Sequence, residues 1–218
     1  MAAACVAALS LAVCGTASAA SAAPAGPIGN PAACPWLNPH LPIAQRVAMV
    51  MKKMTIGNEI TLVEGHGMKP YAGTQPAIPS LCIPQFGLED GPNGVGDGLK
   101  GVTNLASGAS LAATFSPKLA FEYGQVIGAE QATKGSAVDL GPTVNIDRDP
   151  RWGREFESMS EDPQLAAMIG VAEIHGIQSE GIIAQVKHYA VYNQETNRNT
   201  PKDSNANRVR TTSNMTPP

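Results

Sequence analysis

The sequence has no excess of basic residues, no cysteine pair spaced for a metal and no phosphate-binding lysine loop. Its 218 residues carry a net charge of -3 and only 15% charged side chains, so nothing in its charge attracts nucleic acid or an anionic membrane surface. Neither CxxC nor GxxxxGKS/T occurs, and no metal or cofactor is indicated. A neutral substrate fits this composition, and a chain that is 43% hydrophobic can bury a sizeable core.

Charge is missing altogether from the N-terminus. Residues 1–23 contain no charged side chain and end in small residues such as Ala17-Ser18-Ala19, which predicts a secretory signal peptide. Residues 24–33 are rich in proline, glycine and alanine and are predicted to be a linker. We therefore expect a secreted or periplasmic protein, and no membrane span is expected after the signal region.

Only two cysteines, Cys34 and Cys82, would remain after removal of this peptide. An oxidising compartment and an even number of thiols favour one disulfide between them. Two separate buried thiols are the alternative.

Helical and strand patterns alternate along the rest of the chain. Apolar residues at helical spacing predict short helices from Ile43 to Met54 and from Ile56 to Val63. Ser116-Pro117 and Asp162-Pro163 each place a capping side chain before a proline, so two further helices are expected to begin there. The expected strands are Cys82–Leu88, Leu111–Thr114, Val138–Ile146 and Ile182–His188. Strands separated by helices that pack on them imply an α/β protein with parallel βαβ units.

Polar motifs follow three of these strands. They are LEDGPNGVGDG (Leu88–Gly98), GPTVNIDRDPRWGREFESMSEDP (Gly141–Pro163) and QVKHYAVYNQETNR (Gln185–Arg198). In this order they resemble the N-terminal domain of glycoside hydrolase family 3, the β-glucosidase type, and the resemblance runs from about Cys34 to about Ser204. It implies a (β/α)8 TIM-type barrel, whose active site lies at the carboxyl ends of the strands. Because a complete barrel takes about 250 residues, residues 34–204 are expected to form about its first half, and residues 205–218 a disordered or aberrant tail.

The resemblance assigns substrate contacts to Asp90, Arg154, Lys187, His188 and Arg198. A carboxylate can accept two hydroxyl hydrogen bonds, and a guanidinium fork suits adjacent hydroxyls. Taken alone, Asp90 could instead close an Asp-Gly turn, and Arg198 could be a solvated loop residue. Adjacent strand residues face opposite ways, so Lys187 and His188 can reach one sugar only over an irregular backbone. We predict a bulge or a cis peptide there.

No catalytic residue is identified. Retaining glycosidases use two carboxyl groups about 5 to 5.5 Å apart. In the family that the chain resembles, the nucleophile is an aspartate in a Ser-Asp-Trp-like motif. Here neither tryptophan, Trp36 or Trp152, follows an aspartate. The chain is therefore expected to be a fragment of a retaining β-glucosidase-like hydrolase, inactive alone, that carries the half of the site binding a β-linked oligosaccharide or glucoside. One alternative is a non-catalytic carbohydrate-binding protein. Another is a β-N-acetylhexosaminidase of the same family, although its KHFPGHG-like loop stands here as KHYAVYN.

Overall fold

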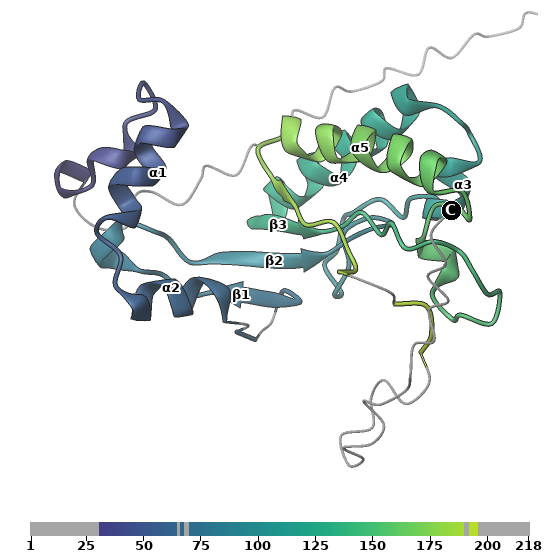
Figure 1. Ribbon diagram of the computed structural model, residues 1–218, viewed down its shortest axis with the longest axis horizontal. Coiled ribbons are helices and arrows are strands. Elements are labelled where there is room, and N and C mark those ends of the chain that lie inside the picture. Colours follow the sequence, from purple (N-terminus) through teal and green to yellow (C-terminus); the bar gives the residue numbers. More distant parts are fainter. Residues whose placement is uncertain (1–30, 65, 68–69, 190–191, 196–218) are drawn as a thin grey trace, which may run out of the picture.

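A mixed four-stranded sheet forms the centre of the computed structural model, which describes residues 31–64, 66–67, 70–189 and 192–195. The predicted signal peptide, most of the predicted linker, Arg198 and the predicted tail lie outside these residues. The sheet order is β1-β2-β3-β4 (Figure 1). Its strands are β1 (Gly73–Gln75), β2 (Phe86–Asp90), β3 (Ser136–Leu140) and β4 (Ile183–Ala184).

Strands β2, β3 and β4 are parallel, and β1 pairs antiparallel with β2 at the edge. Helix α4 (Pro117–Lys134) connects β2 to β3, and α5 (Pro163–Ser179) connects β3 to β4. These are two consecutive βαβ units, as predicted, and they are the repeating element of a TIM-type barrel.

The two long helices begin where the sequence predicts. The Ser116 side chain accepts from the Leu119 amide, and the Asp162 side chain accepts from the Gln164 amide, with proline at the first helical position of each helix. Both helices cover the same face of the sheet (Figure 1). A buried core lies between them and the strands, formed by Leu111, Ala112, Ala120, Tyr123, Ile127, Met159, Ala166, Ile169, Ile177 and Ile182.

Glycines let α4 and α5 approach closely. A Cβ at Gly124 would overlap the Glu173 carbonyl, and one at Gly176 would overlap the Phe121 carbonyl. The obstacle in each case is backbone, which cannot rotate away as a side chain could. The backbones therefore touch where the two helices pack on the sheet.

One predicted strand is wrong. Residues Leu111–Thr114 belong to or follow α3 (Gly108–Ala112), whose N-cap Ser107 accepts from the Ser110 amide. An N-cap followed by an alanine-rich turn stabilises a helix more than the short apolar run favours a strand. The sequence analysis also missed β1, which is too short to show an alternating pattern.

Helices α1 (Ile43–Met51) and α2 (Ile56–Val63) form where predicted, and the Gln75 side chain of β1 donates to the Thr61 carbonyl of α2. They lie at the end of the molecule away from α3 (Figure 1). Three 3-10 turns are also present, at Pro31–Ala33, Pro35–Leu37 and Pro79–Leu81, and a fourth spans Glu155–Glu157.

A second buried cluster surrounds the Cys34–Cys82 disulfide. It contains Trp36, Ile78 and Leu81, and Met49, Val50, Met54 and Leu62 pack against it. No helix of the described residues is long and apolar enough to cross a bilayer.

Candidate functional site

Asp90 and Lys187 meet at the carboxyl end of the parallel strands. Asp90 is the last residue of β2, and Lys187 follows β4 by three residues. The Lys187 Nζ donates to Asp90 Oδ1 over 2.8 Å, with the Lys187 side chain 15% and the Asp90 side chain 50% exposed. The structure thus joins two of the predicted residues from segments 97 positions apart, and leaves the carboxylate accessible from solvent.

The backbone at Lys187 is irregular, which confirms the prediction made from the strand geometry: its peptide bond to His188 is cis. His188 is held by Asn145, whose Oδ1 lies 2.8 Å from the ring Nδ1 and accepts from the His188 amide over 3.1 Å. Since an amide oxygen only accepts, Nδ1 is the nitrogen that carries the proton. Asn145 therefore fixes both the tautomer and the direction of the imidazole.

Arg154 is oriented by a carboxylate from the next turn. Its Nε and Nη2 donate to the two oxygens of Glu157 over 2.7 and 2.8 Å, and the two side chains are only 15% and 12% exposed. Hydrogen bonding to Glu157 raises the pKa of Arg154. Hydrogen bonding to Tyr192 also raises the pKa of Arg154. The guanidinium is thus fixed in direction, with Glu157 holding two of its five N–H groups.

Tyr192 connects His188 and Arg154. Its ring centroid lies 4.5 Å from that of His188 and 5.5 Å from the Arg154 Cζ. Trp152 meets the same ring edge-on at 6.1 Å and is only 3% exposed, so it is a packed core ring rather than an open stacking platform. The sequence analysis did not select Asn145 or Tyr192, although both lie within the quoted motifs, because their roles depend on contacts made only in the fold. Asn145 contacts His188 from 43 residues away, and the Tyr192 ring contacts Arg154.

Ion pairing accounts for other charged residues of this loop. Arg151 pairs with Asp149 on the surface, and Glu157 pairs with Arg154. No group of three His, Cys, Asp or Glu side chains within the described ranges is arranged to hold a metal ion.

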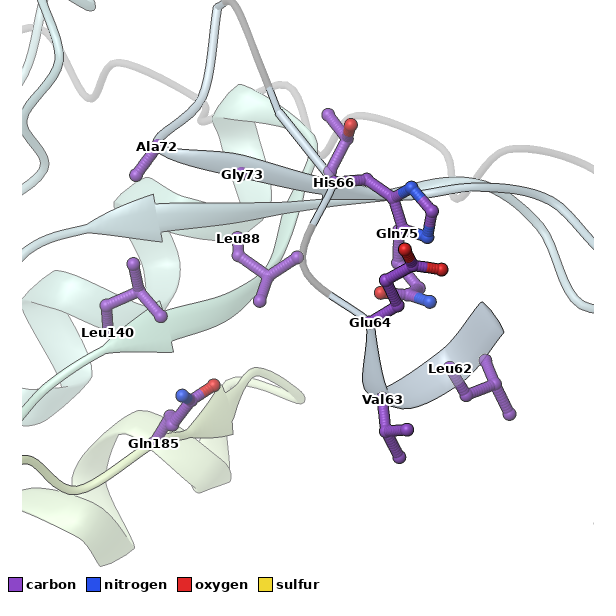
Figure 2. Close-up of a pocket in the computed structure, with 11 residues that line it drawn as sticks. Leu62, Val63, Glu64, His66, Ala72, Gly73, Gln75, Leu88, Leu140 and Gln185 are labelled. Carbon is purple, nitrogen blue, oxygen red and sulfur yellow. The ribbon is translucent and has the colours of Figure 1, made fainter. Parts of the chain in front are cut away.

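A cavity of about 480 Å³ opens on the sheet face away from α4 and α5. Leu88, Leu140 and Gln185 line one side of it, and Leu62, Val63 and Glu64 the other (Figure 2). Side chains alternate along a strand, so Asp90 points to the same face as Leu88. The Asp90–Lys187 pair therefore lies on the open face of the sheet, at the strand ends where ligands of barrel proteins bind.

The opposite face buries a layer of carboxyl groups beneath the strand ends. Glu89 and Asp139 are cross-strand partners with no exposed surface, and Glu173 of α5 is 1% exposed. Burial, with Asp97 as a second cause, raises the pKa of Glu89 to about 7. Burial also raises the pKa of Asp139 to about 7, and the pKa of Glu173 is raised by burial and by Asp139. At neutral pH this layer retains protons that the same groups would release in water.

The free energy of unfolding should therefore fall as pH rises from about 4 to about 7, because the folded chain binds protons that the unfolded chain has released. The groups facing Asp139 are Glu89 on β2, Gln131 on α4, Glu173 on α5, and Asp90 and Lys187 at the strand ends. Urea unfolding midpoints across this range measure the effect. Asp139→Asn should flatten the profile, whereas the exposed control Asp149→Asn should not. A midpoint that rises between pH 4 and 7 would contradict the prediction.

Comparison with known proteins identifies the family. The family model described as the glycosyl hydrolase family 3 N terminal domain matches residues 43–217. The chain belongs to this family. A beta-glucosidase of Bacteroides ovatus is 40% identical over 172 residues, which are 73% of this chain and 22% of the relative. A beta-glucosidase of Rhizobium radiobacter is 37% identical over 156 residues, which are 69% of this chain and 19% of the relative.

Solved structures of family 3 enzymes share the fold. DesR, a beta-glucosidase from Streptomyces venezuelae in complex with D-glucose, matches with a TM-score of 0.65 and 37% identity over 70% of this chain and 20% of its own. Beta-glucosidase 3B from Thermotoga neapolitana in complex with alpha-D-glucose matches with a TM-score of 0.63 and 32% identity over 70% and 24%. The family 3 chain described here thus spans about a fifth of the length of the curated relatives it matches.

Proposed function

We propose that this family 3 domain binds a glucose unit of a β-glucoside through Asp90, Lys187, His188 and Arg154. The observation that carries the proposal is the Asp90–Lys187 pair at the carboxyl ends of the parallel strands β2 and β4, on either side of β3, connected through His188 and Tyr192 to Arg154. Two of the most similar solved structures are beta-glucosidases in complex with D-glucose or alpha-D-glucose, which supports glucose as the bound unit. Arg198, outside the described residues, stays a predicted further contact.

The four side chains offer complementary hydrogen-bonding groups. Asp90 accepts from hydroxyls, whereas Lys187 and Arg154 donate to hydroxyl oxygens, so a pyranose can be held by donors and acceptors together. Because each side chain is fixed by a neighbour, little rotational freedom is lost when the sugar binds.

For a longer chain arranged like the relatives, we propose hydrolysis of β-glucosidic bonds with retention. For the residues of this chain, the proposed role is to position the sugar. Such hydrolysis needs a nucleophilic carboxylate and a carboxylic acid on either side of the scissile bond. No described residue is proposed for either role. The sugar held at the four positions would present its anomeric carbon to those groups.

Glucose binding by the 218-residue chain tests the proposal. Titration followed by NMR should show saturable binding in the millimolar range, worth about 4 kcal/mol. Arg154→Lys should weaken it about tenfold, because an ammonium replaces a fixed fork of donors. Arg151→Lys is the matched control, since Arg151 pairs with Asp149 on the surface, and it should leave the affinity unchanged. Absence of saturable binding, or equal effects of the two substitutions, would refute the proposal.

We further propose export to the periplasm or the cell exterior. The Cys34–Cys82 disulfide supports this, because disulfides persist in oxidising compartments and are rare in the cytosol. Cell fractionation that finds the protein only in the cytosol would contradict export.

A further inference from the structure

Asp139 is a fully buried carboxyl residue that lies directly behind the candidate site. It is the fourth residue of β3, pairs with Glu89 of β2 and Ala184 of β4, and has no exposed surface. Its Oδ1 accepts from Gln131 Nε2 of α4 over 2.9 Å. The charges of Asp90 and Lys187 act on its carboxyl group, but its side-chain hydrogen bond goes to Gln131 and not to either of them.

The two carboxyl oxygens of Asp139 abut two turns. A Cβ at Gly91 would lie 2.5 Å from Oδ1, and a Cβ at Gly141 would lie 2.6 Å from Oδ2. Gly91 directly follows Asp90, and Gly141 begins the loop after β3. Only glycine, which has no side chain, fits this close to the carboxyl group. The carboxyl group of Asp139 is therefore enclosed between the two turns.

The second of these turns is connected to Lys187. The carbonyl of Pro142, the residue after Gly141, accepts from the Lys187 amide over 2.9 Å. The carbonyl of Asp139 itself accepts from the Gln185 amide, also over 2.9 Å. Asp139 thus contacts the turn that follows Asp90, the loop that holds Lys187, and the segment leading to Lys187.

We infer that Asp139 is a positioning residue that fixes the separation and direction of Asp90 and Lys187 by bracing the Gly91 and Gly141 turns. The inference rests on the proposed function where it concerns sugar binding, and on geometry alone where it concerns the turns. An apolar side chain could fill the same space, but it could not accept the Gln131 hydrogen bond that anchors the brace to α4.

The chemistry of the carboxyl group agrees with a bracing role. Its Oδ2 has no hydrogen-bond partner among the described residues, and a buried charge there would be costly. The raised pKa of Asp139, about 7, means that a proton is held by much of the population at neutral pH. Asparagine has the same shape and can keep the Oδ1 contact, so Asp139→Asn should retain the brace, whereas Asp139→Ala should remove it.

Amide hydrogen exchange of the 218-residue chain tests the brace without a sugar. The Gly96 amide donates to the Asp90 carbonyl and the Lys187 amide to the Pro142 carbonyl, so they report on the two sides of the brace. Asp139→Ala should speed exchange at both amides about tenfold, the equivalent of one hydrogen bond, and weaken glucose binding by a similar factor. Asp139→Asn should stay within about twofold of wild type in both measurements.

Val138→Ala is the matched control, because Val138 is the preceding residue of the same strand and is 5% exposed. It should lower overall stability without a selective effect on the two amides or on glucose affinity. The inference is overturned if Asp139→Ala changes these amides no more than Val138→Ala does, or if Asp139→Asn is as damaging as alanine. Faster exchange at both amides in a chain that binds no glucose would uphold the brace and refute the proposed function. If Asp139→Ala leaves the exchange rates of both amides unchanged and still binds glucose, the brace is refuted and the proposed function is upheld.

Discussion

Replacing Cys34 and Cys82 together with alanine is expected to lower the free energy of unfolding by about 4 kcal/mol. The disulfide links residues 48 positions apart, so without it the unfolded chain regains the freedom of a long closed loop. Both cysteines also lie in the small cluster with Trp36, Ile78 and Leu81. In such a small core a covalent link is a large part of the stability.

Chemical unfolding of the wild type and the double variant measures the loss. Reductant added to the wild type should reproduce most of it, and reductant added to the variant should change nothing. Alanine is preferred to serine because both positions are buried, where an unpaired hydroxyl would add a cost of its own. Equal stability of the wild type with and without reductant would contradict the prediction.

Lys187→Met should weaken glucose binding about 30-fold, which corresponds to about 2 kcal/mol. Methionine keeps the length of the side chain but removes the Nζ that holds Asp90 at 2.8 Å. The substitution removes one donor to the sugar and leaves the Asp90 carboxylate without its cation. The estimate is at the low end for a charge pair because Asp90 is half exposed and water can replace part of the interaction.

A double-mutant cycle separates these two effects. Asp90→Asn combined with Lys187→Met should cost less than the sum of the single losses, because the unpaired charge is gone. Lys118→Met is the matched control, since Lys118 forms an exposed pair with Glu122 on α4 and should not affect binding. Strict additivity, or an equal loss for Lys118→Met, would contradict a direct partnership of Asp90 and Lys187 in the site.

The local signals of the sequence predicted the α/β order well. Serine or aspartate before proline located the starts of α4 and α5, and apolar spacing located α1 and α2. The strand expected at Leu111–Thr114 is instead the end of α3 and the turn after it, because the Ser107 cap favours a helix there. Where α1 and α2 pack could not be predicted, because the cluster that receives them is assembled from segments on both sides of the Cys34–Cys82 link.

The candidate site was predictable only where residues stand in a motif. Asp90, Arg154, Lys187 and His188 were selected from such motifs, and the structure brings Asp90 to Lys187. Asn145 orients His188 from 43 residues away. Tyr192 follows His188 closely in sequence, but it also contacts the distant Arg154, and no spacing rule indicates these contacts. The positioning role of Asp139 could not be predicted either, because in the sequence Asp139 is a single polar residue in an apolar strand.

The paired charges of the proposed site affect its selectivity between charged and neutral sugars. Lys187 already faces Asp90, and Arg154 already faces Glu157, so neither cation is available as an uncompensated charge. A uronic acid or a phosphosugar would have to displace a carboxylate that belongs to the protein, and would bring its own negative charge close to that carboxylate. A neutral pyranose only adds hydrogen bonds to pairs that stay intact. If sugar binds at this site as proposed, the ion pairs favour uncharged sugars over charged ones.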